Sequence, residues 1–155
     1  MTEEEKNLTR LQHILFAVNK IQKSLNGLDY QSFITNEDKK DALVTNLTLI
    51  GEAVHRLTGD LRQKNLDCPW RTLIQLRNLL VHEYFRIKYI RLWNIAQNDL
   101  PHFKNRIMEI LNEELTSLLN KGVIDSDCIN KAFSHLQEDT GENIDEEFPR
   151  RRMKM

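Results

Sequence analysis

The chain has 155 residues, of which 40% are hydrophobic and 29% are charged, a composition typical of one folded domain and not of a disordered segment. Its formal net charge of -1 excludes a global positive field, so any nucleic-acid binding must use a local basic patch. The acidic start of the chain and the lack of a long apolar run predict a cytoplasmic protein that does not contact membranes.

Apolar residues recur at spacings of three and four along most of the chain, which is typical of amphipathic helices. We expect one helix at about 4–26, a second at 38–57, and a third that begins at 67–69 and carries Arg77 near its C-terminal end. A fourth runs from about 88 to 122 and is broken near Asp99-Leu100-Pro101. Residues 27–38 and 58–67 read as connections, and Thr35 or Asn36 caps the second helix. Gly51 within that helix costs about 1 kcal/mol relative to Ala. Close approach of a neighbouring backbone would compensate for it.

The character of the chain changes after Gly122. A short apolar pattern predicts a helix at 126–137, and blocks of like charge predict a flexible charged tail at 138–155. The predicted fold is therefore all-α: an antiparallel bundle of four main helices in a domain at 1–122, followed by a C-terminal extension at 123–155.

A local basic patch surrounds the most chemically suggestive stretch, Arg77-Asn78-Leu79-Leu80-Val81-His82-Glu83-Tyr84-Phe85. Between Arg62 and Arg91 only Asp67 and Glu83 oppose the basic residues, which are Arg62, Lys64, Arg71, Arg77, Arg86, Lys88 and Arg91. An arginine fork matches a phosphate, and a histidine can transfer protons near neutral pH. Together they suit RNA cleavage, in which the 2′-hydroxyl is the nucleophile and no metal or cofactor is needed.

Helical geometry limits this interpretation. On one continuous helix the directions of Arg77 and His82 differ by about 140°, too far apart for both to grip one phosphate. Either the helix ends near His82, or two copies of the helix face each other in a dimer, or both. From the residues alone a structural role also remains open: Arg77 in surface ion pairs, His82 at a helix end, and Tyr84 in packing.

The chain resembles the HEPN superfamily, specifically the HepT-like toxins of toxin–antitoxin modules. Their Arg-x4-His-x-Tyr hallmark is matched by Arg77, His82 and Tyr84. Further matches occur in the family's order, over about residues 8–118: Asp41-Ala42, Asn46-Leu47, Ile50-Gly51-Glu52-Ala53, Pro69-Trp70-Arg71, Trp93 and Asp99-Leu100-Pro101. One departure is Arg86, where the family often has glycine.

The resemblance implies a homodimer with metal-independent endoribonuclease activity. His82 and Arg77 would be catalytic, assisted by Asn78, and the weaker substrate contacts would come from Arg71, Arg86 and Lys88. It also implies an antitoxin partner with a nucleotidyltransferase fold, which transfers AMP to Tyr84 and so neutralises the toxin. The alternative is a non-catalytic helical subunit that binds a nucleotide or scaffolds the nucleotidyltransferase.

Other constellations predict less. Glu52 and His55 have the Glu-x-x-His spacing of di-iron bundles, but the chain has no second copy of that motif, so no metal site is expected. Glu52 is instead expected to bond near the motif helix. Trp70 and Trp93 are expected to be core residues, and His13, His102 and His135 to be surface residues.

Overall fold

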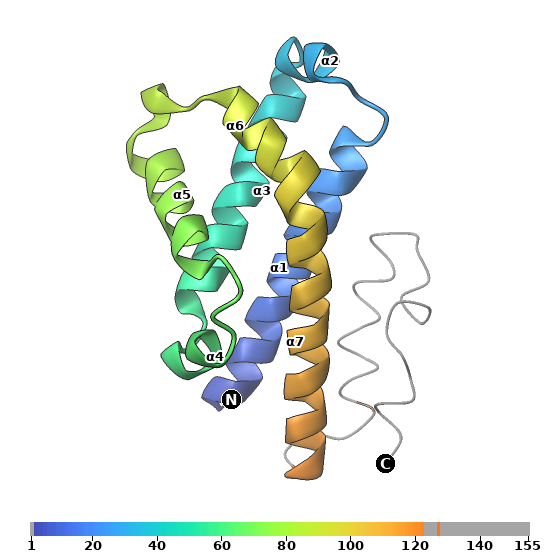
Figure 1. Ribbon diagram of the computed structural model, residues 1–155, viewed down its shortest axis with the longest axis vertical. Coiled ribbons are helices and arrows are strands. Elements are labelled where there is room, and N and C mark those ends of the chain that lie inside the picture. Colours follow the sequence, from blue (N-terminus) through green and yellow to red (C-terminus); the bar gives the residue numbers. More distant parts are fainter. Residues whose placement is uncertain (1, 123–126, 128–155) are drawn as a thin grey trace.

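The computed structural model of the chain describes residues 2–122 and residue 127. Long helices alternate in direction along the described chain (Figure 1): α1 (Glu3–Leu25), α3 (Glu37–Arg56), α5 (Trp70–His82) and α7 (Leu100–Asn120). Shorter elements connect them: α2 (Tyr30–Ile34), α4 (Gly59–Lys64), the 3-10 turn η1 (Tyr84–Arg86), α6 (Tyr89–Asn94) and the π-helical turn η2 (Ile95–Asp99). The all-α antiparallel bundle is confirmed. The predicted helix at 126–137 and tail at 138–155 lie outside the described residues, apart from Asp127.

Side-chain caps fix where the first long helices begin. Thr2 and Glu5 form a capping box, in which the Thr2 backbone N–H donates to the Glu5 carboxylate over 2.7 Å. Asn36 caps α3 by accepting from the Lys39 backbone N–H at 3.1 Å, as one of the two sequence alternatives predicts. Gly27 ends the first helical segment with a φ of 77°, a conformation that favours glycine.

The two predicted connections each contain a short helix, so that part of the prediction is wrong. Asp29 caps α2 by accepting from the Ser32 N–H at 2.8 Å, and Thr58 caps α4 by accepting from the Leu61 N–H at 3.3 Å. Buried Asn7 of α1 forms two hydrogen bonds with Thr58. The Asn7 amide donates to the Thr58 hydroxyl at 2.9 Å, and the Asn7 amide oxygen accepts from the Thr58 backbone N–H at 3.1 Å. Local caps thus stabilise helices too short to show apolar periodicity.

The later helix boundaries follow the proline positions. Pro69 lies at the N-cap of α5, just before its first turn, and Pro101 lies in the first turn of α7, where its missing N–H does no harm. The expected break near Asp99 is the π-helical turn η2, after which the chain continues directly into α7.

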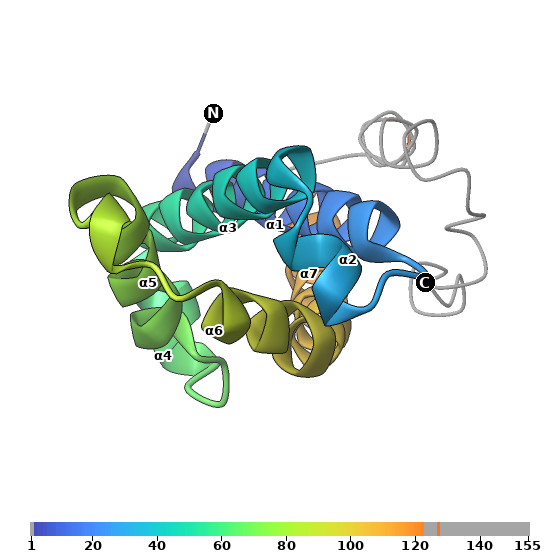
Figure 2. The ribbon, with the colours of Figure 1, turned by 90° about the horizontal axis from the view of Figure 1, so that it is seen from above.

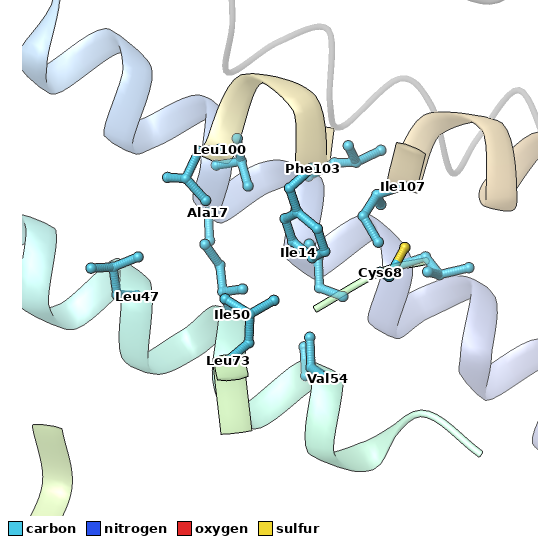
Figure 3. Close-up of a cluster of buried hydrophobic side chains, with 14 of the residues drawn as sticks. Ile14, Ala17, Leu47, Ile50, Val54, Cys68, Leu73, Leu100, Phe103 and Ile107 are labelled. Atoms are coloured by element: carbon cyan, nitrogen blue, oxygen red, sulfur yellow. The ribbon is translucent and has the colours of Figure 1, made fainter. Parts of the chain in front are cut away.

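The core fills the space between the long helices (Figure 3) and includes Ile14, Ile50, Leu73, Phe103 and Ile107. Both tryptophans pack in it, as predicted. The buried Trp70 ring donates its N–H to the carbonyls of Arg62 and Asn65, at 3.2 and 2.9 Å. Half-buried Trp93 lies against Phe33, with their ring centroids 5.1 Å apart.

The helix α5 stands at the edge of the bundle and packs mainly on α3, whereas α1 contacts both α3 and α7 (Figures 1 and 2). The buried residues of α5 form one stripe along the helix, so its opposite face does not pack on the bundle; they are Trp70, Leu73, Leu76 and Leu80. Among the described residues, no helix combines the length and apolar character that a membrane crossing requires.

Candidate active site

Arg77 is anchored by side chains around it. Its Nε donates to Glu52 Oε1 at 2.6 Å, its Nη2 lies 2.5 Å from the same oxygen, and its Nη1 donates to Asn78 Oδ1 at 2.8 Å. Glu52 comes from the facing helix α3, and the side chains of Arg77 and Glu52 are 24% and 31% exposed. The carboxylate therefore fixes the guanidinium in one orientation, as bonds to a charged partner do.

Gly51 makes this arrangement possible. A Cβ built on Gly51 would lie 2.3 Å from Arg77 Cβ and 2.9 Å from the Leu73 carbonyl oxygen, closer than real contacts allow. The backbones of α3 and α5 therefore approach at a point where only glycine fits. This close approach was the expected compensation for a glycine within a helix.

The anchored Arg77 keeps part of its donor set. Three of its five N–H groups bond Glu52 and Asn78, which leaves two for an anion. The Glu52 carboxylate cancels the charge of Arg77, so the positive charge that attracts a phosphate must also come from neighbouring cations. Asn78 is exposed, and because its oxygen accepts from Arg77, its amide N–H groups remain able to donate.

His82 lies at the end of α5. The helix stops there, Glu83 closes it with its backbone N–H on the Leu79 carbonyl at 2.9 Å, and a 3-10 turn follows. The helix end that the first of the two geometric solutions requires is present, although His82 is itself the last residue of the helix. The imidazole is exposed and, within the described residues, has no hydrogen-bond or ion-pair partner. It is thus positioned at the surface and available to a substrate.

Tyr84 lies beyond the helix, in η1, and is 53% exposed. It therefore does not share a helical stripe with Arg77, as it would on a continuous helix. Its hydroxyl lies beside that of Tyr89. The pKa of Tyr89 is raised, first by the burial of Tyr89 itself and then by its hydrogen bond with Tyr84. Tyr89 itself packs on Phe33, with ring centroids 6.4 Å apart, so the aromatic cluster around α2 and α6 supports the Tyr84 turn.

The three weaker substrate candidates are all exposed but occupy different places. Arg86 is in η1 and pairs with Glu83 at 3.3 Å, and Lys88 precedes α6. Arg71 is in the first turn of α5, at the opposite end of the helix from His82. The structure thus brings Arg77 and Asn78 into contact and places Arg86 and Lys88 in the segment that follows His82, whereas Arg71 is at the other end of α5.

Glu52 bonds the motif helix, as expected from the sequence, and the structure identifies Arg77 as its partner. His55, its partner in the rival Glu-x-x-His pattern, is exposed near the end of α3. In residues 2–122 and 127, no three His, Cys, Asp or Glu side chains gather as a metal site requires.

Comparisons with known proteins agree with this picture. The family model "Ribonuclease HepT-like" matches residues 14–110. A protein of Methanocaldococcus jannaschii named "Putative RNase MJ1380" is 37% identical over 97 residues, 63% of this chain and 89% of its own length. "Putative RNase TTE0752" of Caldanaerobacter subterraneus is 31% identical over 104 residues, 67% of this chain and 93% of its own length.

A more distant relative carries the family's name. "Probable ribonuclease HepT" of Thermococcus cleftensis is 25% identical over 100 residues, 64% of this chain and 91% of its own length. No solved structure is significantly similar. The chain belongs to the HepT-like ribonuclease family, within the HEPN superfamily.

Proposed function

We propose that this chain is a metal-independent endoribonuclease and the toxin of a toxin–antitoxin module. The observation that carries the proposal is an arginine held in place with donors to spare, five residues before a free histidine at a helix end. Membership in a ribonuclease family supports RNA as the substrate.

In the proposed reaction His82 acts as general base and takes the proton of a ribose 2′-hydroxyl. The 2′-oxygen attacks the adjacent phosphorus, and the bond from phosphorus to the 5′-oxygen breaks. The free N–H groups of Arg77, with the Asn78 amide, stabilise the charge that develops on the phosphoryl oxygens. The products are a 2′,3′-cyclic phosphate and a 5′-hydroxyl, whose oxygen takes its proton from solvent or from a protonated histidine.

A homodimer would complete the site. Arg77 and His82 diverge by about 140° around α5, so a second copy of the helix, facing the first, would bring the arginine of one protomer near the histidine of the other. Three apolar side chains near His82 support this arrangement because they are exposed in the single chain: Val81 at 46%, Tyr84 at 53% and Phe85 at 93%. Large exposed apolar side chains of this kind mark interaction surfaces.

Tyr84 is the proposed target of the antitoxin. A nucleotidyltransferase partner would transfer AMP from ATP to the Tyr84 hydroxyl, forming a phosphodiester and releasing pyrophosphate. The half-exposed Tyr84 side chain, two residues from His82, supports this role. The added phosphate would carry negative charge next to the cations that hold RNA and would compete with the substrate.

The experiment uses purified, unmodified protein, a single-stranded RNA and excess EDTA, with the same sequence as DNA and as RNA carrying one 2′-deoxy position. We expect cleavage of the RNA alone and protection at the deoxy position. The alternative, a non-catalytic nucleotide-binding subunit, predicts no cleavage. Intact mass after co-expression with a nucleotidyltransferase tests the regulation: we expect additions of whole AMP units that Tyr84→Phe abolishes.

A further inference from the structure

A second feature of α5 lies away from His82. Around the start of this helix the surface forms a hollow of about 630 Å³, between α4, the connection before α5 and the first turns of α5. Its size falls within the range of small-ligand sites. The side chains that matter are Arg62, Leu66, Arg71, Ile74 and Gln75.

The hollow is positively charged. No Asp or Glu lines it, and within the described residues neither Arg62 nor Arg71 forms an ion pair. The nearby acidic residue Asp67 is already bound: Arg106 of α7 donates to it at 2.6 Å, which lowers the pKa of that carboxyl. Arg71 is exposed and Arg62 is partly exposed, so two guanidinium charges are available for an anion.

The hollow also offers apolar surface. Leu66 is 78% exposed and Ile74 is half-buried, and both line the same cavity as the arginines. Phosphate-binding cations beside an apolar contact surface suit a nucleotide of a single strand, because each nucleotide has both a charged backbone and a base with a flat apolar face.

The free face of α5 connects this hollow to the candidate active site. At 100° per residue, Arg71, Gln75, Asn78 and His82 fall within about 60° of one another on the helix surface. All four are exposed. The axial separation of Arg71 and His82 is about 16 Å, which is about five stacked nucleotides.

We infer that the hollow is a second RNA subsite, where Arg62 and Arg71 hold a backbone phosphate a few nucleotides from the bond cut at His82. Gln75 and Asn78 line the path between the two positions. This inference rests on the proposed ribonuclease function and adds to it a minimum substrate length. RNA long enough to reach the hollow binds more tightly than RNA that occupies the cleavage position alone.

The experiment compares the double variant Arg62→Gln/Arg71→Gln with a matched control, Lys20→Gln/Lys23→Gln. The control removes the same charge from a different hollow, between α1 and α3, which also lacks acidic lining. Binding is measured with a fluorescent 12-nucleotide RNA that is 2′-O-methylated throughout, so that it cannot be cut. Cleavage is measured with an ordinary dinucleotide and an ordinary 12-nucleotide RNA.

We expect the arginine variant to bind the 12-nucleotide RNA about ten-fold more weakly, and its slope of log K against log salt to shrink by about 0.7, because the two arginines together neutralise one phosphate. Cleavage of the dinucleotide should fall less than cleavage of the 12-nucleotide RNA, and the lysine control should match wild type in every assay. Arg71→Gln alone, at an exposed position, should show part of the loss and should leave thermal unfolding unchanged.

Equal weakening by the lysine control, an unchanged salt slope, or an equal loss on the dinucleotide would overturn the inference. A change of oligomeric state in the arginine variant, measured by sedimentation, would overturn it too, because the hollow would then be an interface between copies of the chain. Normal arginine-dependent binding without any cleavage would instead refute the proposed catalysis and retain the subsite.

Discussion

Arg77 and His82 are five residues apart on one helix, yet their surroundings are opposite. Arg77 is held by Glu52 and Asn78 at a point where α3 and α5 approach closely. His82 is the last residue of the helix, exposed and without a partner in the described chain. The fold thus fixes the cation in advance and leaves the base to be positioned by substrate or by a second protomer.

The largest expected effect is at the free end. His82→Ala should lower the rate of RNA cleavage by about 100- to 10,000-fold, the usual contribution of a general base. The free energy of unfolding should stay within about 0.5 kcal/mol of wild type because the side chain is exposed. Urea unfolding and a cleavage assay check both values, and His55→Ala, at another exposed histidine of the bundle, should change neither. A large loss of stability would mean that His82 is structural.

The locked end is tested through Glu52. Glu52→Gln retains the shape of the side chain but removes the charge that orients Arg77. Hydrogen bonds to a charged group contribute about 1.5–3 kcal/mol, and the substitution weakens those that hold Arg77. We expect a fall in the cleavage rate of about ten- to a hundred-fold, as a misdirected Arg77 no longer meets the phosphate. Glu37→Gln, at the exposed start of the same helix, serves as the control. Faster cleavage by Glu52→Gln would show that the ion pair holds Arg77 away from the phosphate and does not direct it there.

Gly51→Ala separates the helix approach from the charge. The added methyl group would collide with Arg77 Cβ and the Leu73 carbonyl, so we expect a destabilisation of about 1–3 kcal/mol, typical of overpacking. Gly59→Ala is the matched control because a Cβ there meets nothing within 4 Å, and it should be neutral or stabilise by up to about 1 kcal/mol. Both are measured by urea unfolding. Equal effects would contradict the close approach of the two backbones.

The smallest effect on stability is expected at Phe85, which is 93% exposed. Phe85→Ser should leave the free energy of unfolding within about 0.5 kcal/mol of wild type. Sedimentation velocity should nevertheless show a shift from dimer to monomer, since the proposed protomer interface loses its largest apolar contact. A variant that remains fully dimeric would place the interface elsewhere.

Several of these features were predictable from sequence because they depend on long patterns. Apolar periodicity gave the four main helices, and the need to compensate Gly51 correctly indicated a close neighbour. The short helices α2 and α4 were missed because one or two turns carry no periodicity; their only signals are the caps Asp29 and Thr58. The expectation that Glu52 bonds near the motif helix is confirmed, but its exact partner, Arg77, was not identified. Which carboxylate faces it depends on the register between α3 and α5, which side-chain packing determines.

The chemistry of the RNA ends tests the proposed cleavage reaction most directly. Purified protein is incubated with RNA in EDTA, and the products of wild type and Arg77→Ala are analysed by mass spectrometry. We expect 2′,3′-cyclic phosphate and 5′-hydroxyl ends from wild type and, for Arg77→Ala, a loss of rate of about 100-fold or more, the usual cost of removing an electrostatic stabiliser. Ends with 3′-hydroxyl and 5′-phosphate, or an unchanged rate in Arg77→Ala, would contradict the proposed reaction.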